Sequence, residues 1–216
     1  MKFQQEGTFH GGFGGIGHEP PSDLLLLKQI HGDKIYSLTR REEVAQFRGN
    51  QGDAILSCIP GQPVGVRMAD CVPILIAHPS GWVGAVHAGW RGTAKRILAK
   101  TLKKLSQEIS ENLADAILAI GPAISGENYE VGAEVAEAFS ESGSEWLRSK
   151  GNKFLLDLKG INRQQAIEAG VPESHIRVFP QCTFSDPAFF SYRRAQLWNE
   201  DREGRNYAWV MREPLK

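Results

Sequence analysis

The stretch MADCVPILIAHPSGWVGAVHAGWRG, residues 68–92, contains two apolar runs separated by the turn sequence PSG. Runs such as VPILIAH (72–78) and WVGAVHA (82–88), bounded by turn residues, are typical of buried β-strands. His87 closes the second run and is followed by small residues that let the backbone approach another group closely. Cys71 directly precedes the first run, so a short turn between the strands brings Cys71 and His87 near each other.

Outward from this stretch the chain is β-rich in its first half and mixed afterwards. Apolar residues recur at three- and four-residue steps over 97–109, which predicts a surface helix with Thr93 as its cap. Shorter helices are expected at about 131–139 and 158–169. Further β-like runs occupy 23–31, 33–38, 53–57, 63–68, 115–121, 175–180 and 207–213. Short connections between these elements favour an α+β fold with layered, mixed sheets.

The first part of the chain differs in composition. HGGFGGIGHEPP, residues 10–21, is rich in Gly and Pro, and we expect 1–22 to be irregular. It is not a dinucleotide-binding fingerprint, because no strand precedes it and Pro20 and Pro21 stand where a helix should begin. We expect one domain over 1–216, a length common for single domains.

Composition excludes several function classes. Lysine plus arginine equals aspartate plus glutamate at 25 each, so no overall charge attracts nucleic acid or an anionic membrane. The run LLLL is too short to span a bilayer, and the N-terminus lacks the pattern of a signal peptide. Three cysteines are too few and odd in number for a disulfide scaffold. We therefore expect a cytoplasmic protein with a small-molecule substrate.

Three segments carry side chains that bind metals or act as nucleophiles: KQIHGD with His31, MADCVP with Cys71, and AVHAGWRG with His87. Two imidazoles and a thiolate are ligands of a catalytic zinc, which keeps a further position for water or substrate. Each residue also has an ordinary interpretation, as a turn histidine, a buried thiol or a core imidazole. Asp70 is a candidate to orient a ligand histidine, or alternatively caps a strand end.

Cationic and aromatic side chains near these segments offer substrate contacts. Arg91 and Arg193 are candidates to bind phosphate or carboxylate, whereas for Arg194 we favour a solvated surface position. Other nearby residues are the cation Arg67 and the aromatic side chains Trp90, Phe189, Phe190 and Tyr192, which either stack on a flat base or belong to the core.

Read together, KQIHGD, GDAILS, MADCVPILIAHPSGWVGAVHAGWRG, IGPAIS…YEVG and QCTFSDPAFFSYRR resemble the laccase-domain proteins. This family, also called multicopper polyphenol oxidoreductase or polyphenol oxidase-like, is understood as purine nucleoside phosphorylases with adenosine deaminase activity. The resemblance implies an α/β/β/α fold like that of the cytotoxic necrotizing factor-like cysteine hydrolases. It also implies a catalytic zinc centre of His31, Cys71 and His87, with Arg91 and the FSYRR segment near the pocket. The implied reactions are phosphorolysis of adenosine, inosine and methylthioadenosine, and deamination of adenosine.

The chain departs from the family pattern in two places. The region before KQIHGD is short, and a usual Pro-Cys-Cys-Tyr stretch is replaced by SGENY at 125–129. Two other functions stay open. Copper-dependent phenol oxidation by a multicopper cluster needs many imidazoles, and the chain has six histidines, although a single copper suits the same three ligands. A Cys71-dependent hydrolase or amidase acting on cell-wall precursors would use His87 as its base.

Overall fold

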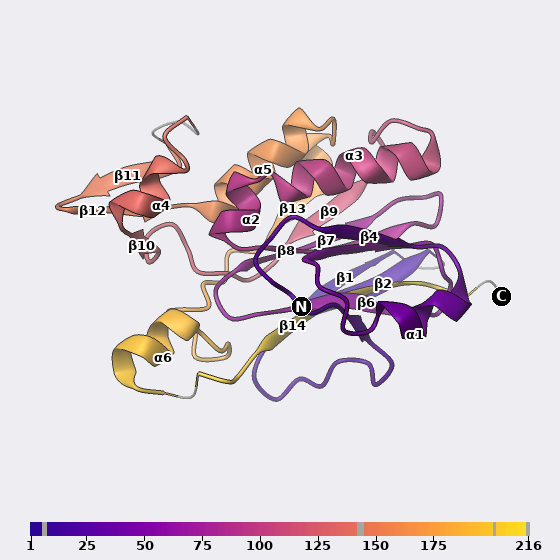
Figure 1. Cartoon of the computed structure of the whole chain (residues 1–216), viewed down its shortest axis with the longest axis horizontal. Helices are drawn as coiled ribbons and strands as arrows, with labels where there is room; N and C mark the ends of the chain where they lie inside the picture. The colour runs from indigo at the N-terminus through magenta and orange to yellow at the C-terminus, as the bar shows by residue number, and fades with distance from the viewer. Residues whose placement is uncertain (6–7, 142–144, 201, 215–216) are drawn as a thin grey trace.

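The computed structural model describes residues 1–5, 8–141, 145–200 and 202–214 (Figure 1). Two β-sheets pack face to face, and apolar side chains from both fill the space between them. In these described residues the six-stranded sheet has the order β13 (Ile176–Val178), β9 (Ile117–Ile120), β7 (Val72–Ala77), β8 (Val83–Ala88), β5 (Ala54–Ser57) and β4 (Ile35–Leu38). The five-stranded sheet has the order β1 (Lys2–Gln5), β2 (Phe9–Gly14), β14 (Asn206–Arg212), β6 (Val64–Met68) and β3 (Leu25–Leu26).

The predicted hairpin of β7 and β8 is confirmed and lies at the centre of the six-stranded sheet. Its strands are antiparallel, with Val72 opposite Ala88 and Pro73 opposite His87. Every residue of both strands is buried, because one face of this sheet packs on the other sheet and the other face on helices. Burial on both faces explains why these strands are continuous apolar runs without polar alternation.

One layer of helices covers the outer face of the six-stranded sheet (Figure 1). It contains α2 (Trp90–Ala94), α3 (Ile97–Ile109) and α5 (Leu158–Glu168). The predicted helix over 97–109 is confirmed, and its apolar positions are buried in the core. The prediction of Thr93 as its cap was wrong: Thr93 is buried inside α2, and the left-handed Arg96 (φ 60°) separates α2 from α3.

The prediction of an irregular segment over 1–22 was also wrong for its first part. β1 and β2 form an antiparallel pair, and β2 continues into the sheet beside β14. The glycines of β2 permit close backbone approach: a Cβ at Gly11 would lie 2.2 Å from the carbonyl oxygen of Trp209, and one at Gly12 2.2 Å from that of Met1. Glycine-rich sequence marks tight strand packing here.

Several elements lie beyond the two main sheets. A small sheet has the order β10 (Glu130–Val131), β12 (Lys153–Leu156) and β11 (Leu147–Lys150), and the expected helix at 131–139 shortens to α4 (Ala133–Glu137). Helix α6 (Tyr192–Trp198) was not anticipated. The remaining short elements are the 3-10 turns η1 (Arg41–Glu43) and η2 (Glu173–His175) and the one-turn helix α1 (Val44–Phe47).

Within the part of the chain that the structure describes, helices form a full layer on one side of the two stacked sheets only (Figure 1). In the described residues, no comparable helical layer lies on the far side of the five-stranded sheet (Figure 1). The fold is α+β with mixed sheets, as expected, but the second helical layer of the expected α/β/β/α order is missing there. No helix in the described part of the chain is both long and apolar enough to cross a membrane.

Candidate metal centre

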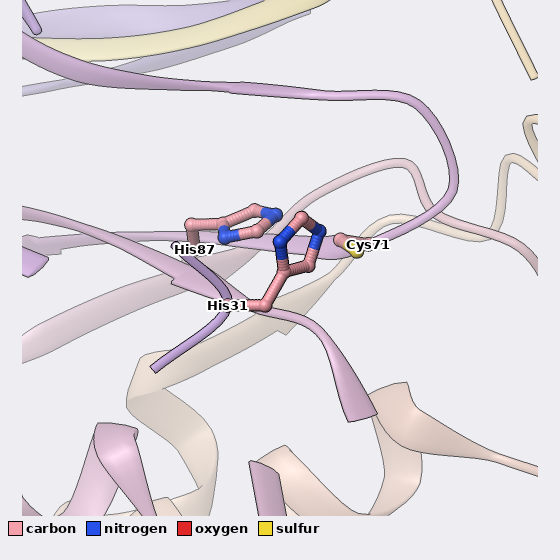
Figure 2. Close-up of side chains that lie close together, drawn as sticks. All are labelled: His31, Cys71 and His87. Atoms are coloured by element: carbon pink, nitrogen blue, oxygen red, sulfur yellow. The ribbon is translucent and has the colours of Figure 1, made fainter. Parts of the chain in front are cut away.

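His31, Cys71 and His87 lie together at one end of the central hairpin (Figure 2). Their ligand-capable nitrogen and sulfur atoms all lie within 4.8 Å of one another. The two imidazole rings have centroids 5.0 Å apart and meet edge to face. His31 is exposed, Cys71 is half-buried and His87 is buried, so the cluster is reached from solvent on the His31 side.

Each side chain arrives from a different kind of local structure. His87 lies within β8, and Cys71 directly precedes β7. The register of the hairpin, with Val72 opposite Ala88, places Cys71 beside Gly89. A Cβ at Gly89 would lie 3.0 Å from the sulfur of Cys71 and 3.3 Å from the ring of His31. A side chain at position 89 would therefore crowd Cys71 and His31, and glycine leaves room for both.

His31 does not end a long strand, as we had expected. Of the run at 23–31 only β3 (Leu25–Leu26) is a strand, and His31 lies in the following loop with a left-handed backbone, φ 57°. Left-handed non-glycine residues are uncommon and occur at sites that the surrounding structure holds in place. Here the restraint comes from a buried carboxylate.

That carboxylate belongs to Asp53, directly before β5, and it is 1% exposed. It accepts the backbone N–H groups of Ile30, His31 and Gly32 at 3.2, 3.0 and 2.8 Å. The same carboxylate lies 2.9 Å from Nδ1 of His87. The backbone N–H of His87 also donates to the Asp53 carbonyl oxygen at 2.8 Å. One acid thus positions the His31 loop and the His87 ring together.

The Asp53 contact assigns the two nitrogens of the His87 ring. Nδ1 donates its proton to the carboxylate, which leaves Nε2 for a metal or for Cys71. We had considered Asp70 for orienting a histidine, and this was wrong, because its carboxylate contacts Thr183 and Arg193. The sequence signal for Asp53 was a charged residue directly before the buried run at 54–57.

The electrostatics of the centre favour a charged pair. Burial by itself would raise the pKa of the Cys71 thiol, but the positive charge of His87 and hydrogen bonds from both histidines lower that pKa to about 6. Burial likewise opposes charge on His87, but Cys71 and Asp53 raise its pKa to about 9. At neutral pH the thiolate form is favoured, which is the form that binds metals and attacks electrophiles.

The donor set fits a first-row metal ion. Two imidazoles and a thiolate, with one imidazole oriented by a carboxylate, are the chemistry of a zinc centre that keeps a further position for substrate. Copper also binds such ligands. Among the residues that the structure describes, this is the one cluster of three or more histidine, cysteine or acidic side chains with that capacity.

Both candidate phosphate-binding arginines lie over aromatic rings. The guanidinium carbon of Arg91, an exposed residue, is 4.3 Å from the centroid of the Trp90 ring. Arg193 is half-buried, donates from Nη1 to the carbonyl oxygen of Glu130 at 2.8 Å, and has its guanidinium carbon 5.4 Å from the centroid of the Tyr129 ring. These contacts order the two cations without pairing them with a carboxylate.

Tyr129, against whose ring the Arg193 guanidinium lies, is a residue that the sequence did not single out. Burial, followed by the negative charge of Cys71, raises the pKa of its hydroxyl to about 12. Tyr129 and Arg193 therefore lie within electrostatic range of the candidate metal centre. Its hydroxyl stays protonated at neutral pH and is available as a hydrogen-bond donor.

A family model described as "Multi-copper polyphenol oxidoreductase laccase" matches residues 15–213. The chain belongs to this family. A purine nucleoside phosphorylase of Synechocystis is 36% identical over 203 residues, which cover 82% of this chain and 76% of the relative. A purine nucleoside phosphorylase of Deinococcus radiodurans is 37% identical over 175 residues, covering 80% of this chain and 65% of that protein. This laccase-domain chain thus spans about two thirds to three quarters of the length of these relatives.

Solved structures support the fold of this laccase-domain chain. The crystal structure of the hypothetical protein YfiH of Bacillus licheniformis matches with a TM-score of 0.81 and 26% identity. The match covers 94% of this chain and 92% of that one. The mixed α+β arrangement is therefore shared with a protein of nearly the same length.

Arg194, expected on the surface, is instead buried at 8% exposure. Its guanidinium donates to Glu200 and to backbone carbonyl oxygens of the preceding loop, at Thr183, Phe184, Asp186 and Phe189. Arg194 is buried because a guanidinium has five N–H donors in a rigid fork, and these bond to carbonyl oxygens of a loop that has no regular structure. In this laccase-domain protein, Arg194 shapes the segment before α6.

A cavity of about 480 Å³ lies away from the metal centre. It is bounded by the β11–β12 hairpin, the start of α5 and Ser125, and includes none of the three candidate ligands. The cluster of His31, Cys71 and His87 is the candidate functional site, because the cavity lining has no comparable cluster of nucleophilic and metal-binding groups. The volume of a cavity does not by itself identify a functional site, whereas a group of reactive side chains that point toward one another does.

Proposed function

We propose that this chain is a zinc-dependent purine nucleoside phosphorylase acting on adenosine, inosine and methylthioadenosine. The supporting observation is the coincidence of two facts. Relatives named purine nucleoside phosphorylase align over four fifths of the chain, and the chain has a solvent-reached cluster of two histidines and a cysteine. The proposal includes adenosine deaminase activity, in which water replaces the amino group at C6 and ammonia leaves.

Phosphorolysis breaks the bond between the sugar C1′ and the purine nitrogen and forms a bond between C1′ and a phosphate oxygen. The purine leaves with the electron pair and takes up a proton. Phosphate must therefore be held beside C1′ in the correct orientation. Arg91 and Arg193 suit that role because a guanidinium binds two phosphate oxygens at once, and aromatic rings already order both side chains.

His31, Cys71 and His87 would hold the metal, with Asp53 fixing the orientation of His87. Bound zinc supplies Lewis acidity, which stabilises negative charge on a substrate oxygen or nitrogen. Copper is the alternative ion for the same donors. Tyr129, protonated at neutral pH, offers a hydroxyl donor to the substrate.

The proposal is tested by incubating purified protein with each nucleoside with and without phosphate. We expect free purine and a sugar 1-phosphate only when phosphate is present, and ammonia release from adenosine without phosphate. Protein stripped with a chelator should lose both activities and regain them with zinc. Purine release that is independent of phosphate would contradict a phosphorylase.

A second function is favoured by one specific observation, the chain of contacts from Asp53 through His87 to Cys71. A carboxylate that orients an imidazole beside a low-pKa thiol is the arrangement of a cysteine hydrolase. Without metal, the Cys71 thiolate would attack an amide carbonyl, such as that of a cell-wall precursor, and the amine would leave with a proton from His87. Water, deprotonated by His87, would then hydrolyse the thioester to a carboxylic acid and regenerate Cys71. Zinc would block inactivation by iodoacetamide in the phosphorylase, whereas the hydrolase would be active without metal and inactivated by alkylation.

A further inference from the structure

Asp70 stands directly before Cys71, in the connection between β6 and β7. It is 8% exposed and has a left-handed backbone, φ 89°. A buried aspartate in this conformation is unusual, and its carboxylate contacts neither histidine of the metal centre. Its contacts lead instead to distant parts of the chain.

The Asp70 carboxylate joins two segments that are more than a hundred residues away. Oδ1 accepts the hydroxyl of Thr183 at 2.7 Å, and Oδ2 accepts the backbone N–H of Arg193 at 2.7 Å. The Asp70 carbonyl oxygen also accepts the N–H of Ile124 at 3.0 Å. Short bonds to a charged acceptor of this kind are among the stronger hydrogen bonds in proteins.

The partners of Asp70 are also joined to one another by hydrogen bonds. Thr183 is fully buried, and its N–H donates to the carbonyl oxygen of Ala123 at 3.1 Å. Its own carbonyl oxygen accepts from the Arg194 guanidinium at 2.9 Å, so the loop and the first turn of α6 form a connected unit. Because Asp70 directly precedes Cys71, its hydrogen bonds attach that unit to the Cys71 segment.

The Asp70 contact also affects Arg193, which is a candidate to bind the substrate phosphate. While its backbone N–H bonds to Asp70, its guanidinium reaches Tyr129 and the carbonyl oxygen of Glu130. The position of that guanidinium relative to Cys71 therefore depends on the Asp70 contact. A shift of about 1 Å in a substrate-positioning group is enough to impair catalysis strongly.

We propose that Asp70 is a positioning residue: its carboxylate ties Thr183 and Arg193 to the Cys71 segment and so sets where the Arg193 guanidinium meets substrate phosphate. The inference rests on the proposed phosphorylase function for the phosphate contact. The tie between Asp70 and the first turn of α6 can be tested without any activity.

Asp70→Asn is the direct test, because asparagine keeps the size of the side chain but replaces one acceptor oxygen with a donor. Asp115→Asn, at an exposed aspartate, is the matched control. We expect the zinc content of Asp70→Asn to equal that of the parent, and the KM for phosphate to rise roughly tenfold, as for loss of one charge-assisted hydrogen bond. The kcat should change much less than the KM.

A double-mutant cycle with Arg193→Ala shows whether Asp70 acts through Arg193. If it does, Asp70→Asn has little further effect on the phosphate KM once Arg193 is alanine. Fully additive effects would overturn the proposal. Thr183→Val, which removes the hydroxyl donor to Oδ1, replaces Asp70→Asn if the latter does not fold.

Hydrogen exchange separates this inference from the proposed function. In Asp70→Asn the backbone amide of Arg193 should exchange faster than in the parent and in Asp115→Asn. If the parent protein shows no phosphorolysis but the Arg193 amide still exchanges faster in Asp70→Asn, the proposed function is refuted. The structural role of Asp70 in holding Arg193 is then retained. Unchanged protection at Arg193 together with an unchanged phosphate KM would overturn the role of Asp70.

Discussion

The carboxylate of Asp53 lies 2.9 Å from Nδ1 of His87 and accepts the backbone N–H of His31 at 3.0 Å. One buried side chain therefore contacts two of the three candidate metal ligands, although they come from a loop and from the end of a strand. The geometry of the candidate metal centre therefore depends on a residue that is not itself a candidate ligand.

Asp53→Asn should weaken the centre while leaving all three ligands present. The neutral amide loses charge-assisted bonds to the 30–32 loop and to His87, so we expect zinc affinity to fall by roughly 10- to 100-fold. The free energy of unfolding should fall by about 1–3 kcal/mol. Chelator competition and denaturant unfolding measure the two effects, with Asp115→Asn as the control; an unchanged zinc affinity would contradict this role.

Cys71→Ala removes the one sulfur ligand. We expect loss of bound metal and of nucleoside turnover, with near-parental circular dichroism because Cys71 is a small side chain at the edge of the core. Cys58→Ala is the matched control, since Cys58 is also half-buried and lies outside the cluster. Adenosine turnover at the parent rate in Cys71→Ala would defeat the metal-centre assignment.

Arg91→Ala separates the two proposed reactions. Phosphate is a substrate of phosphorolysis and not of deamination, so removal of a phosphate-binding cation should lower the first rate by roughly 10- to 100-fold and the second much less. The comparison uses adenosine for both reactions, with purine and ammonia release followed in the same preparation. Equal losses would show that Arg91 holds the nucleoside or the fold instead.

The central hairpin and the long helix were predictable because burial on a sheet or on one helix face leaves a periodic or continuous apolar pattern. The runs at 72–78 and 82–88 and the helix at 97–109 are of this kind. β2 was not predictable, because its glycines are explained by the carbonyl oxygens of Met1 and Trp209, and only the folded chain brings these close. The strands β11 and β12 were not predictable either, because β11 is mostly exposed and β12 is largely half-buried, so neither has a continuous apolar run.

The proximity of Cys71 and His87 was anticipated from the short turn between their strands, and His31 was added from its chemistry and from the family resemblance. The residues that support the three were not anticipated. Asp53 and Asp70 are both acids beside strands, and composition does not distinguish them. Their different partners, His87 for one and Arg193 for the other, depend on sheet order. Arg194 was misjudged for a similar reason, since its carbonyl partners belong to a loop whose path the sequence does not reveal.

Arg194→Lys tests the structural role of that buried guanidinium. An ammonium has three donors and cannot reproduce the fork that serves Glu200 and several carbonyl oxygens. We expect a loss of about 2–4 kcal/mol in the free energy of unfolding, the range for a broken buried hydrogen-bond network. The same substitution at the exposed Arg202 should have a negligible effect, and an equally small effect at Arg194 would refute the role.

We expect Cys182 to contribute to the free energy of unfolding in a pH-dependent way. Its sulfur accepts from the backbone N–H of Ser125 at 3.3 Å and from the Asn128 amide at 3.5 Å. Burial opposes ionisation of the thiol, but hydrogen bonds from Ser125 and Ser185 lower its pKa from 9.0 to about 7. A thiol with a lowered pKa in the folded state contributes stability that is fully present above pH 9 and lost as the pH falls through 7.

The stability difference between the parent and Cys182→Ala should therefore be larger at pH 9 than at pH 6. Urea unfolding at several pH values measures it, and the other two cysteines are common to both proteins. A difference that stays constant between pH 6 and pH 9 would show that the folded thiol has its ordinary pKa.

The most direct test of the metal-centre account is the metal content of the parent protein purified without added metal, measured by mass spectrometry alongside its phosphate-dependent purine release. The account predicts about one zinc per chain and adenine release from adenosine that requires phosphate. Metal-free protein that neither gains activity with zinc nor releases purine would contradict it and favour the cysteine hydrolase.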